Sequence, residues 1–268
     1  MASILDKIIQ TKRQEVEQAK AARSLAELRA DIAALPPPRN FFQAVTQPPR
    51  GLLNLIAEVK KASPSAGVIR PDFDAVRIAT TYQSAGADAL SVLTDTPWFQ
   101  GSLDDLRAVK QAVAIPILRK DFIIDPYQVY QSRAAGADAI LLIAECLDTS
   151  QMIDLQILAT EQNLTCLIEV HDMENLIRVR DHVIGFPHRG YSLLGINNRD
   201  LTTFITDLGT TLRLAELVED KRVLISESGL RSRRDAEKLA AVGVNTVLVG
   251  ETLMRSDDPA ATISELFG

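Results

Sequence analysis

The chain has 268 residues, of which 46% are hydrophobic and 24% are charged, and its formal net charge is −6. This is the composition of an ordinary globular enzyme, and an acidic chain without a block of lysines and arginines is not expected to bind nucleic acid. Two cysteines, Cys146 and Cys166, are too few for a disulfide framework, and no uncharged run approaches the roughly 20 residues of a membrane span, so we expect a cytoplasmic protein.

The first 50 residues predict a helical extension that precedes the main fold. Ser3 is a suitable N-cap, and apolar side chains recur at helical spacing through the charged residues 3–34, which do not resemble a secretion signal. Three prolines at 36–38 end the helix, and residues 40–51 are interpreted as a linker back to the main fold. We expect the apolar stripe to pack across one end of that fold; a helix that binds a partner protein is the alternative.

From residue 51 onward, eight short apolar runs alternate with stretches of helical character. Apolar runs that do not alternate with polar residues are typical of parallel strands buried on both faces. The predicted strands are 55–60, 89–94, 115–120, 139–145, 165–169, 193–197, 222–227 and 246–250. The predicted helices are 72–85, 102–114, 125–135, 148–162, 173–183, 207–218, 232–242 and 258–267.

Eight strand–helix units predict one α/β domain, a (β/α)8 TIM barrel over residues 51–268 with the N-terminal helical extension in front of it. The sequence Ala-Gly-Ala-Asp at residues 85–88 returns at 135–138 and, more loosely, at 242–245, which indicates duplication of one unit. Each copy places a glycine where a helix has to end. A doubly wound open sheet has the same local pattern, but no Gly-x-Gly-x-x-Gly follows the first strand here.

Charged side chains stand at the ends of several predicted strands, where barrel enzymes place their active sites. Glu58 and Lys60 share one face of the first strand, and such a pair is either structural or part of a site. Lys120 and Glu169 point inward at the ends of the third and fifth strands, whereas Arg119 points away. Partial burial is expected to lower the pKa of the lysine and raise that of the glutamate. A network that only holds the barrel together is the alternative.

The last predicted strands are followed by two glycines. Gly229 and Gly250 follow the seventh and eighth strands, whose loops often bind phosphate in barrel enzymes, although one glycine per loop can also simply turn the chain. Lys60 and Ser63 could close this phosphate pocket, because the first and eighth strands are neighbours in a closed barrel.

The histidines indicate no further site. His171 is expected to be a rim histidine that is turned away from the mouth of the barrel, and His182 and His188 are expected to be exposed. No serine–histidine–aspartate or cysteine–histidine set converges on one strand end, and the spacing of a metal site is lacking. We therefore expect neither nucleophilic nor metal chemistry.

Taken together, the motifs resemble those of the indole-3-glycerol phosphate synthase family, which are barrel enzymes of tryptophan biosynthesis. The resemblance spans nearly the whole chain and includes the helical extension. The matching segments are Ile-Ala-Glu-Val-Lys-Lys-Ala-Ser-Pro-Ser (56–65), Leu-Arg-Lys-Asp-Phe (118–122), Leu-Ile-Glu-Val (167–170), Gly-Ile-Asn-Asn-Arg-Asp-Leu (195–201) and Ser-Glu-Ser-Gly (226–229).

The resemblance implies a lyase that closes 1-(2-carboxyphenylamino)-1-deoxyribulose 5-phosphate to indole-3-glycerol phosphate, with loss of CO₂ and water and without a cofactor or metal. The lysine that matches Lys120 is the usual general acid of the family, and the glutamate that matches Glu169 is the usual base or acid of the dehydration. Glu58 and Lys60 would position the substrate, and Lys60 could also carry protons. Further implied substrate contacts come from Asn197, Arg199, Glu227 and Ser228.

The resemblance also implies where the two ends of the substrate bind. Phe99 and Phe122 resemble the aromatic walls around the anthranilate ring. The phosphate would rest on Ser63, Gly229, Gly250 and the backbone of Glu251. The chain departs from the family at Asn198 and Glu251, where relatives often carry serine, and a glutamate at 251 weakens a side-chain contact to phosphate but not one through its N–H.

Two other functions are compatible with the residues. The nearest is another phosphate-binding barrel lyase or synthase that uses Lys120 to form a Schiff base. The other is an inactive barrel that serves as an assembly scaffold, which would leave four charged side chains at one mouth without a use. We expect a monomer whose partner is a small phosphorylated substrate and whose affinity falls when residues 1–40 are removed.

Overall fold

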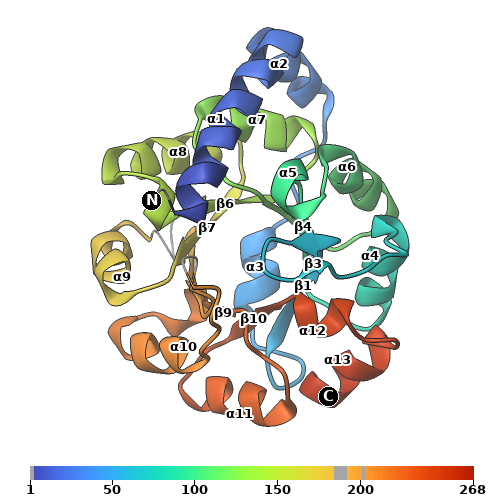
Figure 1. Ribbon diagram of the computed structural model, residues 1–268, viewed down its shortest axis with the longest axis vertical. Helices are drawn as coiled ribbons and strands as arrows, with labels where there is room; N and C mark the ends of the chain where they lie inside the picture. Colours follow the sequence, from blue (N-terminus) through green and yellow to red (C-terminus); the bar gives the residue numbers. More distant parts are fainter. Residues whose placement is uncertain (1–2, 184–191, 201–202) are drawn as a thin grey trace.

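The computed structural model describes residues 3–183, 192–200 and 203–268, so the predictions at His188 and Leu201 lie outside the described residues. Eight parallel strands close into a barrel in the order β1-β10-β9-β8-β7-β6-β5-β4, with helices around it (Figure 1). This confirms the predicted TIM barrel. The strands are β1 (Asn54–Val59), β4 (Ala89–Leu93), β5 (Ile117–Lys120), β6 (Ala139–Ile143), β7 (Thr165–Val170), β8 (Ser192–Asn197), β9 (Leu224–Glu227) and β10 (Thr246–Val249).

The predicted helices also form, and most begin at an aspartate or serine whose side chain accepts a backbone N–H in the first turn. The helices around the barrel are α4 (Ala75–Ser84), α6 (Leu103–Ala112), α7 (Pro126–Ala134), α8 (Thr149–Glu161), α9 (Met173–Val179), α10 (Gly209–Leu214), α11 (Arg233–Ala241) and α13 (Pro259–Phe267). The loops add α5 (Thr96–Phe99), α12 (Glu251–Met254), the hairpin β2 (Ala62–Ser63) and β3 (Gly67–Val68), and the 3₁₀ helices η1 (Ala144–Cys146), η2 (Arg180–His182), η3 (Ala215–Leu217) and η4 (Lys221–Val223).

The repeated Ala-Gly-Ala-Asp segments connect helices to the strands that follow them. Gly86 and Gly136 have φ angles of +97° and +92°, in the left-handed region that favours glycine, so each ends its helix as predicted. The carboxylate of Asp88 then accepts the backbone N–H of Leu55 in β1, and that of Asp138 accepts the backbone N–H of Ile117 in β5, at 2.9 Å in both cases. The aspartates thus satisfy donors at the N-terminal ends of β1 and β5.

The helical extension consists of two helices instead of the single helix predicted for residues 3–34. Helix α1 (Ile4–Ala22) ends at Arg23, and Ser24 caps α2 (Leu25–Ala34) with its own capping box, so a new helix starts in a new direction. The first turns of α1 cross the end of the barrel where the strands finish, and α2 lies against α7 (Figure 1). The expectation that the apolar stripe covers one mouth is therefore confirmed for α1.

The segment predicted to be a linker contains a buried helix, so that interpretation is wrong. Helix α3 (Phe41–Thr46) buries Phe41, Phe42 and Val45 inside the barrel interior, against side chains such as Ile56 and Leu118. The carbonyl of Val45 accepts hydrogen bonds from the side chains of Asn54, which begins β1, and Thr246, which begins β10, the latter at 2.5 Å. Helix α3 therefore closes the barrel at the end opposite the mouth.

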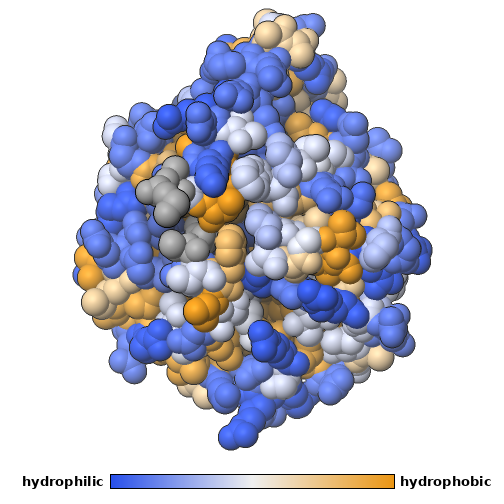
Figure 2. Space-filling model, in the orientation of Figure 1, coloured by the Kyte–Doolittle hydropathy of each residue, from blue (hydrophilic) through white to orange (hydrophobic). Residues whose placement is uncertain are grey.

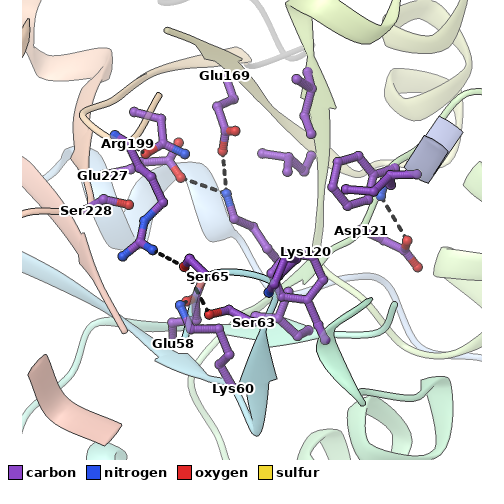
Figure 3. A pocket seen from close by; sticks show the side chains of 18 of the residues that line it. Glu58, Lys60, Ser63, Ser65, Lys120, Asp121, Glu169, Arg199, Glu227 and Ser228 are labelled. Carbon is purple, nitrogen blue, oxygen red and sulfur yellow. Dashed lines mark hydrogen bonds and ion pairs between the residues drawn. The ribbon is translucent and has the colours of Figure 1, made fainter. Parts of the chain in front are cut away.

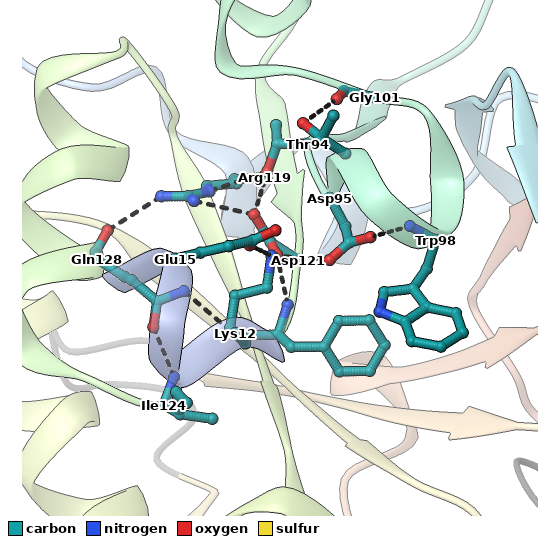
Figure 4. A network of polar contacts seen from close by, with 12 residues as sticks. Lys12, Glu15, Thr94, Asp95, Trp98, Gly101, Arg119, Asp121, Ile124 and Gln128 are labelled. Atoms are coloured by element: carbon teal, nitrogen blue, oxygen red, sulfur yellow. Dashed lines mark hydrogen bonds and ion pairs between the residues drawn. The ribbon is translucent and has the colours of Figure 1, made fainter. Parts of the chain in front are cut away.

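Helix α1 is fixed to the barrel by an ion cluster around Lys12 (Figure 4). The Lys12 side chain is 4% exposed, and its Nζ lies 2.7 Å from Asp95 Oδ2 and 2.9 Å from Asp121 Oδ1. Asp121 also accepts from Arg119 at 2.9 Å, outside the barrel wall where the sequence predicts that arginine. Because Asp121 directly follows Lys120, this cluster links the helix over the mouth to the end of β5.

Replacing Lys12 by methionine is expected to lower the free energy of unfolding by about 3 kcal/mol, because the buried Asp95 and Asp121 lose a counter-charge while the apolar stem is kept. Urea unfolding followed by circular dichroism measures the difference. Lys7→Met, at an exposed position of the same helix, serves as the control. Equal stability of the Lys12 variant and the unchanged protein would contradict a structural role for this cluster.

The face of the protein that Figure 2 shows is mostly hydrophilic. Figure 2 shows charged and polar side chains over most of the surrounding helices, with hydrophobic residues at the surface beside the first turn of α1. Among the helices of the described residues, none has the length and apolarity to cross a membrane.

Candidate active site

The structure brings the predicted site residues together at the end of the barrel where the strands finish (Figure 3). One cavity there lies between the strand ends and the first two turns of α1. Among the predicted residues it is lined by Glu58, Lys60, Ser63, Phe99, Lys120, Phe122, Glu169, Asn197, Arg199, Glu227 and Ser228. A smaller cavity beside it shares four of these residues and is completed by Gly229, Gly250 and Glu251.

Lys120 lies at the centre of the charged groups in this cavity. It is the last residue of β5, and its Nζ donates to the carboxylates of Glu169 and Glu227, the latter at 2.8 Å (Figure 3). Glu169 lies on β7 and Glu227 ends β9. The lysine side chain is 12% exposed and the carboxylates are 3% and 1% exposed, so the cluster is nearly removed from solvent. Closure of the barrel therefore joins residues from three distant parts of the chain.

The protonation of this cluster differs from the sequence prediction. Burial alone would lower the pKa of Lys120, but the surrounding carboxylates, Glu169 foremost, outweigh burial and raise that pKa above its usual value. Burial alone would likewise raise the pKa of Glu169, but Lys120 and then His171 outweigh it and lower that pKa. The predicted pKa directions for Lys120 and Glu169 are thus wrong, because ion pairing dominates over burial.

Glu227 is the carboxyl group whose pKa is raised. Its burial is the largest cause, and the negative charge of Glu169 adds to it, while Lys120 acts in the opposite direction. One ammonium group cannot fully compensate two buried carboxylates, so protonation of one of the two carboxylates is favoured. Glu227 takes this proton, because Glu169 has further positive charge beside it. The mouth therefore holds an ionised Glu169 next to a group that readily takes up a proton.

Two glycines make room for these charged side chains. A Cβ atom on Gly195 would lie 2.1 Å from Glu227 Oε1, and one on Gly250 would lie 2.3 Å from Glu58 Oε1. Glu58 accepts a hydrogen bond of 2.5 Å from Lys60 Nζ, so Gly250 provides the space for an ion pair as well as a turn of the chain. Sequence reasoning missed Gly195, since the clash becomes visible only when β8 and β9 are neighbours.

Asn198 is a buried residue between the sixth and seventh barrel strands. Its Nδ2 donates to the backbone carbonyls of Glu227 and Ser228 at 2.9 and 3.0 Å. Its Oδ1 accepts from the backbone N–H of Thr211 at 2.9 Å. Ser228 has a φ angle of +64°, a left-handed conformation that a serine seldom adopts, and these bonds help to hold it. Asn198 therefore fixes the loop after Glu227.

Arg199 connects the two loops on either side of the smaller cavity. Its guanidinium donates to Ser65 Oγ at 2.6 Å and to Glu251 Oε2 at 2.7 Å. Ser63 lies in the same loop as Ser65 and is buried, with its Oγ accepting from Ala66 N at 3.2 Å. Arg199 is thus held at the cavity by a carboxylate of the chain itself.

The opposite side of the main cavity is apolar. The rings of Phe99 and Phe122 lie with their centroids 6.2 Å apart and their planes inclined by 39°. Leu141 and Ile143 of β6 extend this side, and the first turns of α1 cover it. The cavity therefore has a charged half toward the ends of β1, β5, β7, β8 and β9 and an apolar half toward α1, α5 and β6.

His171 does not point away from the mouth, which corrects the sequence prediction. Its side chain is 8% exposed, with Nε2 3.3 Å from Glu169 Oε1 and Nδ1 3.1 Å from Glu145 Oε2. Glu169 and His171 are two residues apart, so alternation favours the same face for both, which the prediction overlooked. His182 lies in η2 and is partly exposed. Within the described ranges, no group of three or more histidine, cysteine, aspartate or glutamate side chains is arranged to hold a metal ion.

Comparison with known proteins identifies similar sequences over the full length. The family model described as indole-3-glycerol phosphate synthase matches residues 5–266. Proteins named indole-3-glycerol phosphate synthase from Neisseria gonorrhoeae and Leptothrix cholodnii are 48% and 46% identical over 268 residues, which is all of this chain and all of theirs. One from Rhodopirellula baltica is 49% identical over 256 residues, covering 96% of this chain and 95% of its own.

Among solved structures, two more distant proteins share the fold. A 3-hexulose-6-phosphate synthase from Salmonella typhimurium superimposes with a TM-score of 0.61 at 15% identity, over 80% of this chain and 96% of that one. An N-acetylmannosamine-6-phosphate 2-epimerase from Clostridium perfringens gives 0.58 at 14% identity, over 80% and 93%. At these identities the likeness is one of barrel architecture.

Proposed function

The chain belongs to the indole-3-glycerol phosphate synthase family, carboxy-lyases of tryptophan biosynthesis, and from this premise we propose how the residues at the barrel mouth carry out the reaction. The substrate is 1-(2-carboxyphenylamino)-1-deoxyribulose 5-phosphate, and the products are indole-3-glycerol phosphate, CO₂ and water. The observation that carries the proposal is the contact of Lys120 Nζ with both Glu169 and Glu227 inside the cavity.

Lys120 acts as the general acid of ring closure. Its contacts with two carboxylates keep the amine protonated at neutral pH, as a proton donor has to be, whereas a Schiff base needs the neutral amine. As the ring carbon that bears the carboxylate attacks the keto carbon, Lys120 delivers a proton to the keto oxygen. Loss of CO₂ then returns the bonding electrons to the ring and restores its aromaticity.

Glu169 serves the dehydration that follows. The hydroxyl group formed from the keto oxygen has to leave as water, while a proton is removed from the ring nitrogen or the neighbouring carbon. Glu169 is ionised and buried, so it can accept a proton. Glu227, with its raised pKa, is placed to hold a proton beside it. Asn197, at the end of β8, lines the same cavity and would contact the substrate hydroxyl groups.

The two halves of the cavity suit the two ends of the substrate. The anthranilate ring would lie against Phe99 and Phe122, and water exclusion there strengthens the polar contacts of the reacting atoms. The phosphate would bind in the smaller cavity, near Ser63 and Ser228 and the backbone of Gly229, Gly250 and Glu251. Lys60 and Arg199 supply positive charge in an acidic protein, with Glu58 orienting Lys60.

We further propose that residues 1–268 work as one domain, because α1 and α3 of the extension pack on the two ends of the barrel formed by residues 51–268. The protein would act as a monomer, since the described residues of one chain supply both cavities. It would act in the cytoplasm, where cysteines such as the free Cys146 and the buried Cys166 stay reduced.

The proposal is tested by adding the carboxyphenylamino-deoxyribulose phosphate to the purified protein and following indole fluorescence together with released CO₂. We expect both products in equal amounts, without added metal or cofactor. The same compound without its phosphate should show a raised KM with a smaller change in kcat, because the phosphate lies away from the reacting atoms. A folded protein that forms no indole product would contradict the proposed function.

A further inference from the structure

A third charged group contacts Glu169 from outside the cavity that the substrate would occupy. The imidazole of His171 lies between two carboxylates, with Nδ1 3.1 Å from Glu145 Oε2 and Nε2 3.3 Å from Glu169 Oε1. Glu145 belongs to η1, after β6, and His171 directly follows β7. Neither Glu145 nor His171 lines the cavity, so neither has a role in the proposed chemistry.

The local structure holds His171 in this position. Its backbone N–H donates to Glu145 Oε1 at 3.1 Å, so one glutamate contacts both the backbone and the ring of the histidine. The next residue, Asp172, caps α9 and fixes the chain on the other side. At this turn the side chain of His171 reaches Glu169.

The charge balance of the Lys120, Glu169 and Glu227 cluster indicates what His171 can do. Glu169 and Glu227 share the single ammonium group of Lys120, and removal of charges from water is costly unless each is compensated. A protonated His171 supplies the second positive charge on the side of Glu169 that faces away from the lysine. The Glu169 carboxylate then has Oε2 on Lys120 and Oε1 3.3 Å from His171 Nε2, so positive charge lies beside both of its oxygens.

We propose that His171, held by Glu145, is a positioning residue that orients Glu169 and keeps it ionised for the reaction. The inference rests on the proposed role of Glu169. It implies a relay of three side chains from η1 through the turn after β7 to the reacting group.

The titration of this relay has a defined direction. Burial alone would lower the pKa of His171, but Glu145 and Glu169 outweigh it and raise that pKa above its ordinary value. Positive charge on His171 in turn lowers the pKa of Glu169. The titratable groups that face this pair, among the described residues, are Glu145 and Cys146 of η1, Lys120 of β5, Glu169 of β7 and Glu227 of β9.

The relay can be observed without measuring activity. The chain has three histidines, so in protein labelled with ¹³C-histidine the His171 resonance is assigned by its loss in His171→Gln. We expect His171 to titrate above the ordinary range of a histidine. Glu145→Gln and Glu169→Gln each remove a negative charge beside the ring and should lower its titration midpoint. A midpoint that neither substitution moves would overturn the relay.

The effect on the reaction is measured with two variants of the same position. His171→Leu removes both the charge and the hydrogen-bond donor, and kcat should fall about 10-fold to 100-fold, the size found when partners that orient metal-binding side chains are removed. KM should stay nearly constant. His171→Gln keeps a donor and should recover part of kcat. His182→Gln is the control on the other described histidine and should leave kcat unchanged.

The pH profile separates positioning from a merely structural role. Both His171 variants lack the positive charge, so the pKa of Glu169 rises and the acidic limb of the kcat profile moves to higher pH. Folded His171 variants with an unchanged kcat and an unmoved limb would overturn the inference even if the protein forms indole product. If Glu169→Gln itself left kcat intact, the proposed role of Glu169 would fail instead, while the NMR titration would still report the contact.

Discussion

Replacing Lys120 by alanine is expected to lower kcat by about 10³-fold, the middle of the range for removal of a general acid. The ammonium group is the proton donor placed between Glu169 and Glu227, and no other cation contacts both carboxylates in the described part of the chain. The change should appear in kcat more than in KM, because proton transfer matters most in the transition state. Indole fluorescence in steady state measures both constants.

Two further variants make this expectation specific. Lys120→Arg keeps the charge, but a guanidinium group hardly gives up its proton, so kcat should remain low while the fold is preserved. Lys238→Ala, on the outer helix α11, removes a lysine far from the mouth and should have no effect. Circular dichroism confirms that the variants fold. Activity of Lys120→Ala close to that of the unchanged protein would reject the assignment of Lys120 as the acid.

Replacing Glu169 by glutamine is expected to lower kcat by about 10²-fold to 10⁴-fold, because the amide has the same shape but cannot accept a proton. If Glu169 serves the dehydration, decarboxylation can still proceed. A single-turnover experiment should then show CO₂ released faster than indole appears. This order of events distinguishes a role in the second step from a general loss of structure.

The matched control for this variant is Glu161→Gln, the same chemical change at the exposed end of α8. It should leave both CO₂ release and indole formation unchanged. Equal slowing of the two products in Glu169→Gln would place Glu169 in ring closure, and normal formation of both would remove it from the mechanism.

The barrel and the meeting of its charged residues could be predicted from sequence because both follow from chain periodicity. Parallel strands buried on both faces appear as short apolar runs, and their ends meet at one mouth whatever the details of packing. Lys120 and Glu169 occupy the last positions of such runs, so their convergence needed only the closure of the barrel. The glycines of the repeated segments could be predicted for a similar reason, since a helix that ends sharply needs a left-handed residue.

The remaining features depend on contacts between distant segments. Helix α3 lies between two groups of prolines and has only six residues, which are too few to show a helical period. Its burial comes from the space left inside the barrel. The contact between His171 and Glu145 joins the end of β7 to η1, which lies 26 residues earlier in the chain. The pKa direction of Lys120 requires knowledge that three carboxylates surround it, and the need for glycine at 195 and 250 requires the positions of side chains on neighbouring strands.

The burial of α3 inside the barrel has a consequence for the synthesis of the protein on the ribosome. Its apolar side chains leave the exit tunnel before any barrel strand, yet Val45 bonds to Asn54 of β1 and to Thr246 of β10, which is among the last segments to be made. The nascent chain therefore carries Phe41 and Phe42 without their final surroundings until synthesis is nearly complete. Chaperones that shield exposed hydrophobic segments would meet this helix before the barrel has closed around it.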